Sequence, residues 1–336
     1  MILSTRTGPS GRLLAVLSLL TTVVLSACNA QQAGSTGGQA AMPKVTISVF
    51  QPPSLGAFLP PIIEAKGLDK KNNVQLEFVE KPSGTYNTDF AAGTDKVGGS
   101  AALLSEALRV NKGVKVAYLF NLFDYWGTVV TAKSDLTDLK GLEGKTMAAD
   151  KATTNYAMFT YFAKKAGVDL DKVNIQTASG PALVTTAQAD RADAVQLWEP
   201  AFTQLTRSTP NKFHELNFVE KWQDYTGQKN SPYLGVAAHQ DWIDANKELI
   251  PRIYAAYKDA ADFLKTNPDE AAKILSDKTK ISADDLQQLF CEPRLGLNVY
   301  PAGQQREAIQ RVFQAGAEIA YLDKVPDDSV IYDGLK

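Results

Sequence analysis

Aromatic rings, hydroxyl groups and side-chain amides recur in short polar segments of this sequence. Aromatic faces pack against flat rings, while hydroxyls and amides orient a bound molecule through hydrogen bonds. The segments therefore predict a site that binds a small molecule by non-covalent contacts. The candidate contacts are Gln51, Leu55, Ser83, Tyr86, Ser100, Tyr125, Trp126, Thr153, Thr154, Asn155, Trp198, Glu199 and Tyr233.

The densest aromatic group consists of Phe123, Tyr125 and Trp126, which lie within four residues of the chain. This group predicts a ligand with an aromatic or heteroaromatic ring, such as a pyrimidine-like vitamin precursor. The alternative is that part of the aromatic content belongs to the hydrophobic core. We favour this second interpretation for Phe50 and Phe58.

An anion such as an alkanesulfonate is the alternative ligand. Bidentate arginine forks are the usual partners of such anions. The candidate segments contain no arginine, and Glu199 would repel an anion if it faced the site. Both observations favour a ring compound, although Glu199 also fits a role at a hinge.

Residues suited to catalysis or metal binding are sparse. His214 and His239 lie far apart and lack cysteine or carboxylate neighbours at the spacing of metal ligands. Gly144 and Lys145 resemble part of a phosphate-binding loop, but Leu139 stands where that motif requires glycine. We therefore predict no catalytic residue, no metal site and no cofactor.

The candidate contacts follow predicted strands. Short apolar runs predict strands at residues 45–50, 74–79, 114–120, 127–132, 145–149, 173–177 and 192–197. Helical patterns alternate with them at residues 59–66, 101–110, 155–166 and 182–189. This alternation predicts an α/β fold with doubly wound parallel sheets. Ligands of such sheets bind beyond the carboxyl ends of the strands, where the candidate contacts lie.

Several of the candidate hydroxyls also fit a structural role. A helix N-terminus carries unpaired N–H groups that can bind polar ligand atoms, and a Ser or Thr at this position can cap the helix instead. Both interpretations stay open for Ser83, Ser100, Thr153 and Thr154.

Two successive sets of strands and helices predict two lobes joined by a hinge. We expect the first lobe at residues 44–132 and 233–336, and the second at residues 133–232. An apolar stripe over residues 249–264 predicts a helix in the C-terminal part. Hydrophobic residues make up 44% and charged residues 21% of the chain, which is typical of a globular protein. A net charge of -2 without basic runs argues against nucleic acid as a partner.

The N-terminal segment predicts export. Residues 1–27 combine two arginines with an apolar run and contain no acidic residue, as in a signal peptide. Cys28 follows Leu-Ser-Ala and is the predicted lipidation site, after which residues 28–43 form a predicted flexible tether. The alternative is an ordinary signal peptide with a chance cysteine. Cys291 is then unpaired, and we expect it to be a small buried residue.

Short motifs occur in a fixed order at residues 50–56, 82–84, 98–101, 138–141, 144–146, 197–201 and 267–272. Together they resemble the solute-binding lipoproteins of ABC importers in the nitrate, sulfonate, taurine and thiamine-precursor group. The resemblance spans residues 44–277 and implies a two-lobed periplasmic-binding-protein fold of type II that closes on its ligand. It also implies an ABC permease and its ATPase as partners. The protein would be a monomer, anchored by lipid to the bacterial cell membrane and facing the periplasm or the cell exterior.

Two other functions remain as alternatives. The same fold group includes a cytosolic pyrimidine synthase that consumes its own histidine and carries a cysteine-rich motif, whereas this chain has two cysteines. A structural or adhesive lipoprotein is the second alternative, and the ordered loop motifs argue against it. A ligand-dependent shift in melting would separate a binding protein from a scaffold, and turnover would indicate an enzyme.

Overall fold

The computed structural model describes residues 42–335 with the exception of Trp126. The chain from Met42 onward forms one compact unit. The predicted signal peptide, Cys28 and residues 28–41 of the predicted tether lie outside the described residues. None of the helices that the structure does describe is both long and apolar enough to cross a membrane.

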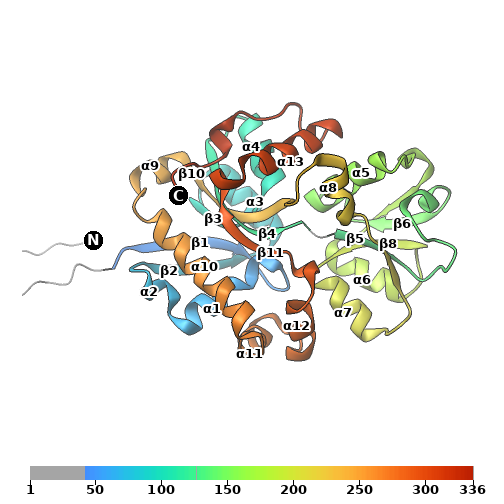
Figure 1. Ribbon diagram of the computed structural model, residues 1–336, viewed down its shortest axis with the longest axis horizontal. Coiled ribbons are helices and arrows are strands. Elements are labelled where there is room, and N and C mark those ends of the chain that lie inside the picture. Colours follow the sequence, from blue (N-terminus) through green and yellow to red (C-terminus); the bar gives the residue numbers. More distant parts are fainter. Residues whose placement is uncertain (1–41, 126, 336) are drawn as a thin grey trace, which may run out of the picture. The chain divides into compact units, whose positions relative to one another are not determined.

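The first sheet has the strand order β11–β4–β10–β3–β1–β2 (Figure 1). Its strands are β1 (Lys44–Phe50), β2 (Gln75–Lys81), β3 (Val97–Ala102), β4 (Val116–Asp124), β10 (Pro232–His239) and β11 (Leu297–Pro301). β1 pairs in parallel with β2 and β3, as the sequence predicts. β10 instead runs antiparallel to β3 and β4, because the chain re-enters this sheet from the second one.

The second sheet has the strand order β7–β6–β8–β5–β9. Its strands are β5 (Gly127–Thr131), β6 (Thr146–Ala149), β7 (Asn174–Thr177), β8 (Ala194–Trp198) and β9 (His214–Leu216). β6 is parallel to β7 and β8, whereas β5 is antiparallel to β8 and β9. The two sheets confirm the predicted α/β fold with two lobes. The expectation of purely parallel sheets is wrong at β5 and β10, which carry the chain between the lobes, and at β11, which is antiparallel to β4.

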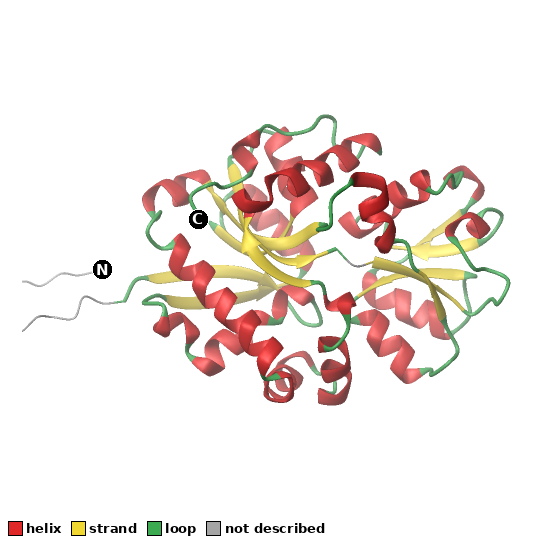
Figure 2. Cartoon of the chain, in the orientation of Figure 1, coloured by secondary structure: helices red, strands yellow, loops and turns green. Residues whose placement is uncertain are grey.

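Helices surround both sheets (Figure 2). They are α1 (Leu59–Lys66), α2 (Leu68–Lys71), α3 (Ser83–Ala92), α4 (Leu103–Asn111), α5 (Thr154–Lys165), α6 (Gly180–Gln188), α7 (Ala201–Ser208), α8 (Trp222–Thr226), α9 (Gln240–Ala245), α10 (Ile250–Thr266), α11 (Pro268–Thr279), α12 (Ala283–Phe290) and α13 (Arg306–Glu318). Their starts follow local sequence signals. The Thr153 hydroxyl accepts a hydrogen bond from the Tyr156 N–H at the start of α5, and Pro268 is the first residue of α11.

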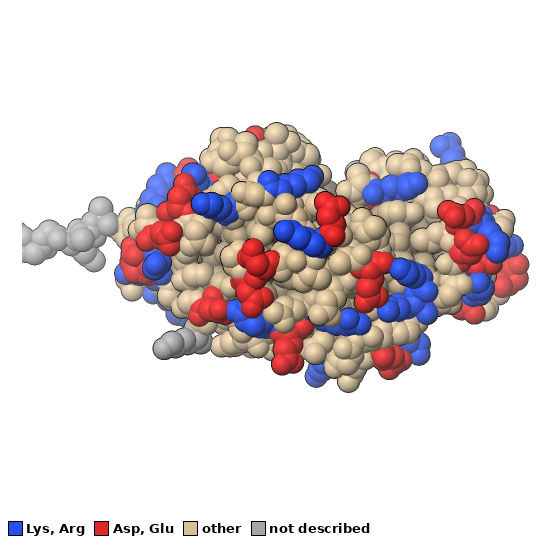
Figure 3. All heavy atoms as spheres, turned by 90° about the horizontal axis from the view of Figure 1, so that it is seen from above, with Lys and Arg blue, Asp and Glu red and all other residues tan. Residues whose placement is uncertain are grey.

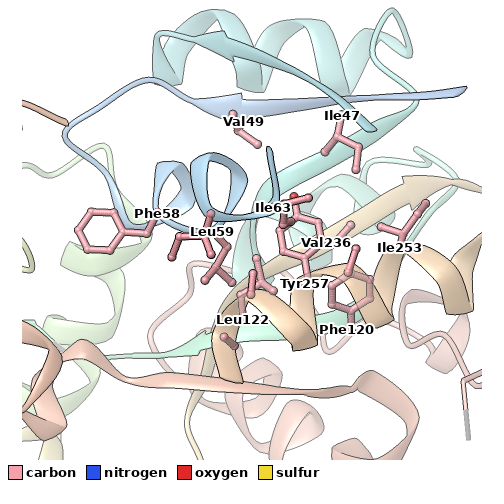
Figure 4. Packing of buried hydrophobic residues seen from close by; sticks show 14 of the residues in the cluster. Ile47, Val49, Phe58, Leu59, Ile63, Phe120, Leu122, Val236, Ile253 and Tyr257 are labelled. Carbon is pink, nitrogen blue, oxygen red and sulfur yellow. The ribbon is translucent and has the colours of Figure 1, made fainter. Parts of the chain in front are cut away.

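One hydrophobic cluster fills the first lobe. Ile47 and Val49 project from β1 toward α10, which contributes Ile253 and Tyr257 (Figure 4). Phe120 of β4 packs edge-on against Tyr257, with 5.6 Å between the ring centroids. The apolar stripe predicted over residues 249–264 is therefore the buried face of α10, and the side chain of Phe58 belongs to the same core.

A second hydrophobic cluster extends from one lobe into the other. It joins Tyr118 of β4 and Phe313 of α13 to Val129 of β5 and to Phe159 and Phe162 of α5. A third, smaller cluster lies between β8 and the helices α6 and α7. The second cluster gives the two lobes a continuous apolar connection next to the strands that cross between them.

The chain crosses between the lobes at two adjacent places. Only residues 125 and 126 separate β4 from β5, and Ser231 directly precedes β10 on the return. The Tyr125 N–H donates to the Ser231 carbonyl at 2.7 Å, so the two crossings are hydrogen-bonded to each other. The sheets therefore place residues 127–131 in the second lobe, whereas the sequence assigned them to the first. An apolar strand pattern reports burial and does not indicate which sheet the strand joins.

Two further expectations concern the surface. Cys291 is exposed and not buried as we expected, because the buried face of α12 is formed by Leu286 and Leu289 and the helix ends at Phe290. Lys and Arg side chains are interspersed with Asp and Glu on the face seen in Figure 3. This mixture agrees with the net charge of -2, and no extended region of one charge sign lies on that face.

Candidate functional site

The two crossings bring three of the predicted contact residues together. The Asn155 side-chain amide donates to the Tyr233 hydroxyl at 3.0 Å, which joins the first turn of α5 to β10. The rings of Tyr125 and Tyr233 pack edge-to-face with their centroids 5.7 Å apart. The Tyr125 hydroxyl lies 3.4 Å from the Asn155 carbonyl. We call Tyr125, Asn155, Tyr233 and the neighbouring Gln196 the crossover cluster.

Gln196 was missed by the sequence analysis because it lies inside a predicted strand and not in a loop. Its side-chain amide donates to the Asn155 carbonyl at 2.9 Å, which fixes the amide orientation. The Oε1 atom of Gln196 and the Oδ1 atom of Asn155 are then buried, with no hydrogen-bond partner among the described residues. Buried polar atoms are costly when unpaired, so these two amide oxygens can accept hydrogen bonds from donors that the described residues do not supply.

A small cavity of about 10 Å³ lies beside the crossover cluster. It is lined by Leu103, Leu104, Tyr125, Thr154, Met158, Pro232, Tyr233 and Val312. Both lobes thus contribute to its walls. The predicted contact Thr154 lines the cavity, whereas Thr153 serves as the N-cap of α5.

The crossover cluster is electrically neutral. Burial raises the pKa of Tyr125 well above its ordinary value, and burial also raises the pKa of Tyr233. Both hydroxyls therefore stay protonated at physiological pH. Because Asn155 and Gln196 are amides, the cluster presents dipoles and aromatic faces but no formal charge to a ligand.

A second group of predicted contacts lies at the carboxyl ends of the first-lobe strands. The Phe50 N–H at the end of β1 donates to the Ser100 hydroxyl of β3 at 2.8 Å. The Phe50 ring packs edge-on against Tyr86 of α3, with 4.8 Å between centroids. Ser100 and Tyr86 are fully buried, and the Tyr86 hydroxyl has no hydrogen-bond partner within the described part of the chain.

The remaining first-lobe contacts divide between surface and core. Gln51 and Ser83 are exposed, and the Gln51 N–H donates to the Lys81 carbonyl at 2.9 Å. Leu55 packs into the core of the first lobe, so the structure does not bring it to the crossover cluster. Trp126 lies outside the described residues, and its predicted role stays untested.

Trp198 and Glu199 follow one another at the end of β8 but face different surroundings. Trp198 is half-buried and lies near the start of α6, where a Cβ on Gly180 would be 3.5 Å from the indole ring. Glu199 is buried, and its carboxylate accepts hydrogen bonds from Thr203 at 3.1 and 3.2 Å and from Arg294 at 3.1 Å. Its partners are therefore protein groups of both lobes, and its predicted contact with a ligand stays untested.

The described residues form neither a metal site nor a cluster of histidines. They contain no group of three or more His, Cys, Asp or Glu side chains that could hold a metal ion. The ring of His239 is buried against the Phe90 carbonyl at 2.7 Å, and that of His214 bonds the Leu136 carbonyl at 2.8 Å. A crevice of about 530 Å³ also lies at the crossings. Its walls include the predicted contact Tyr125, together with Ser231, Asp124, Trp222 and Asn298.

The family model described as "NMT1/THI5 like" matches residues 62–271 of this chain. This match covers the second sheet, the first sheet without β1 and β11, and most of the predicted contacts. The chain belongs to the NMT1/THI5-like family. The resemblance predicted from the short sequence motifs is thereby confirmed.

Curated relatives of this NMT1/THI5-like chain carry the name "Putative binding protein". Those of Brucella abortus (strain 2308) and Brucella suis biovar 1 (strain 1330) are each 22% identical over 207 residues. The matched segment is 62% of this chain and 61% of each relative. The chain thus spans about three fifths of the length of the curated relatives that it matches.

Solved structures share the fold. The aliphatic sulphonate binding protein SsuA from Escherichia coli is 14% identical, with a TM-score of 0.70 over 87% of this chain and 93% of its own. The alkanesulfonate-binding protein SsuA from Xanthomonas axonopodis pv. citri is 17% identical, with a TM-score of 0.71 over 87% and 99%. A Candida albicans protein with the generic periplasmic binding protein fold is 17% identical, with a TM-score of 0.61 over 86% and 93%. The fold predicted from the sequence is therefore confirmed as a periplasmic-binding-protein fold.

Proposed function

We propose that this protein is the solute-binding component of an ABC import system, which captures a small neutral ring compound between its lobes and passes it unchanged to a permease. The crossover cluster carries the proposal. Tyr125 and Tyr233 supply aromatic faces, while the buried amide oxygens of Asn155 and Gln196 have no hydrogen-bond partner among the described residues. Aromatic faces with a few convergent polar groups are typical of small-molecule sites.

The pattern of polar groups favours a heteroaromatic ligand, such as a pyrimidine-like vitamin precursor. Ring amino and ring N–H groups donate hydrogen bonds, and the two amide oxygens accept them. Arg294, whose fork would suit a sulfonate, is bonded to Glu199 instead. A neutral ligand also avoids placing a charge beside the buried, neutral hydroxyls of Tyr125 and Tyr233.

An alkanesulfonate is the second candidate ligand. The first turn of α5 contributes Thr154 to the cavity, and the unpaired N–H groups of a helix N-terminus favour anions. The described residues around that cavity include no lysine or arginine to complete such a site.

The proposal extends to location and partners. Removal of residues 1–27 and lipidation of Cys28 would anchor the protein outside the cytoplasm by a short tether. The folded part would then act as a monomer beside its permease and ATPase. Capture requires no chemical conversion, so the proposed role is not enzymatic.

A melting scan tests the proposed function. The panel contains pyrimidines, thiamine, aromatic acids, alkanesulfonates, taurine and nitrate. A true ligand at a hundredfold excess over its Kd stabilises the fold by about 2.7 kcal/mol, which raises Tm by a few degrees. A shift with ring compounds is the expected result. A shift with sulfonates alone would contradict the neutral-ring ligand, and turnover of the active compound would contradict a binding role.

Matched variants connect the shift to the site. Asn155→Ala and Trp198→Ala should reduce the shift, measured against the melting temperature of each variant without ligand. Asn174→Ala is the control for the amide because Asn174 is exposed on β7. Trp242→Ala is the control for the indole because Trp242 is half-buried on α9 of the other lobe. Equal shifts in all four variants would place the ligand elsewhere.

A further inference from the structure

An arginine side chain of the first lobe, Arg294, extends into the second lobe. Arg294 lies in the short 3₁₀ turn η5 (Pro293–Leu295), between α12 and the first-sheet strand β11. Its Nε atom donates to Glu199, which follows β8 of the second sheet, at 3.1 Å. Its guanidinium carbon lies 4.6 Å from the ring centroid of Phe202 in α7. Arg294 therefore holds an ion pair and a cation–π contact across the lobe boundary.

The ion pair is buried on the second-lobe side. The Glu199 side chain is 1% exposed and that of Arg294 is 17% exposed. Two further carboxylates lie close to the guanidinium, Glu215 of β9 at 4.0 Å and Glu292 at 3.7 Å. Arg294 is thus the centre of three negative charges. A buried carboxylate that loses its cation is strongly destabilised, because its desolvation is no longer offset.

We propose that Arg294 is a positioning residue that holds the two lobes in the closed arrangement. The inference rests on the proposed function, in which the lobes close on a ligand. When the lobes separate, Glu199 and Glu215 stay with the second lobe and the guanidinium leaves with the first. Closure therefore gains both the charge pairing with Glu199 and the cation–π contact with Phe202.

A neighbouring ion pair offers a matched comparison. Arg207 of α7 and Asp285 of α12 also pair between the lobes, with Nε and Oδ1 2.9 Å apart. The Arg207 side chain is 49% exposed and that of Asp285 is 21% exposed. Exposed pairs contribute little because water competes for both charges. The closing effect should therefore belong to Arg294 and not to Arg207.

Ligand affinity depends on the equilibrium between the open and closed arrangements of the lobes. A ligand that binds only the closed arrangement has an apparent Kd that equals its intrinsic Kd divided by the closed fraction. A substitution of Arg294 would thus raise the apparent Kd although no residue that contacts the ligand is changed.

Hydrogen exchange of the full chain without ligand tests the inference. In Arg294→Ala, peptides covering residues 199–203 and 292–297 should exchange at least about tenfold faster than in the wild type. β1 should exchange at the wild-type rate. Arg294→Lys keeps the charge but loses the planar fork, so an intermediate rate is expected. Arg207→Ala should match the wild type.

The inference would be overturned by wild-type exchange in Arg294→Ala. It would also be overturned by faster exchange spread evenly over both sheets, because that result indicates general destabilisation and not lobe opening. An equal increase of the exchange rate in Arg207→Ala would show that the buried Arg294–Glu199 pair has no special role in closure. Because no ligand is present, failure here is distinguishable from a failure of the proposed function, which the melting scan tests.

Discussion

Glu106 is a buried carboxyl outside the candidate site. It lies in α4 with no exposed surface, pairs with Arg109 one turn later, and has one carboxyl oxygen without a partner among the described residues. Burial raises the pKa of Glu106 to about 7, while the Arg109 charge acts in the opposite direction. The folded protein therefore binds this proton more tightly than the unfolded chain does.

This shift predicts a pH dependence of stability. The stabilising contribution of the Glu106 proton is fully present below the ordinary pKa of 4.5 and is lost as the pH rises through about 7. The free energy of unfolding should therefore fall by roughly 3 kcal/mol across this window in the wild type, relative to Glu106→Gln. Urea unfolding at several pH values measures the difference.

Glu77→Gln is the control for the pH experiment. Glu77 is exposed on β2, and hydrogen bonds from Lys44 and Thr46 lower its pKa, so it titrates below the window. Its curve should run parallel to that of the wild type. Parallel curves for Glu106→Gln and the wild type would show that Glu106 does not titrate between pH 4.5 and about pH 7.

Some residues of the candidate site could be predicted from the sequence. Tyr125 and Asn155 were predicted as contacts because they lie in segments that follow predicted strands, and Tyr233 because it is an aromatic residue near a candidate site. The structure brings the three together. Gln196 was missed because its strand pattern indicates only burial. The partner of Glu199 could not be found either, because Arg294 lies 95 residues away and only the tertiary fold brings the two together.

The element β3 depends on two successive small residues. A Cβ on Gly98 would lie 2.2 Å from the Tyr86 hydroxyl, and one on Gly99 would lie 2.7 Å from the Tyr257 hydroxyl. Both hydroxyls are buried, so neither ring has free space to move into. The missing side chains of β3 allow α3 and α10 to pack closely on the sheet.

This packing predicts that a methyl group added to β3 lowers the free energy of unfolding. Gly98→Ala should lower the free energy of unfolding by about 1–3 kcal/mol, because the added atom overpacks the core against Tyr86. Gly84→Ala is the control, since a Cβ there meets nothing within 4 Å at the start of α3. That change should stay within about 0.5 kcal/mol of the wild type. Chemical denaturation measures both variants, and equal values would contradict the packing argument.

Elements with strong local signals were predicted closely. The helix expected at residues 59–66 is α1 with the same bounds, and the strand expected at residues 145–149 is β6 with one residue fewer. The strand β10 was missed because its sequence, Pro-Tyr-Leu-Gly-Val-Ala-Ala-His, lacks the alternation of an edge strand. Its pairing with β3 and β4 is set by partners more than a hundred residues away.

The whole folded unit begins near Met42 and contains its own hydrophobic clusters. The second cluster joins residues of both lobes, so unfolding one lobe would expose apolar surface of the other. A chain that starts at Met42 should therefore unfold in one calorimetric transition, with Tm within about 2 °C of the full chain. Two separate transitions would contradict the coupling of the lobes.

The two crossings have a consequence for the thermodynamics of capture. Residues 125 and 126 are too few to let the lobes tumble independently, and the bond from Tyr125 to Ser231 fastens the second crossing to the first. The two crossings thus restrict the relative motion of the lobes before any solute arrives. Two separate domains would lose their mutual orientational freedom on binding, at a cost of several kcal/mol. Here the crossings remove much of that freedom during folding, so closure on a solute costs less orientational entropy than it would for two separate domains.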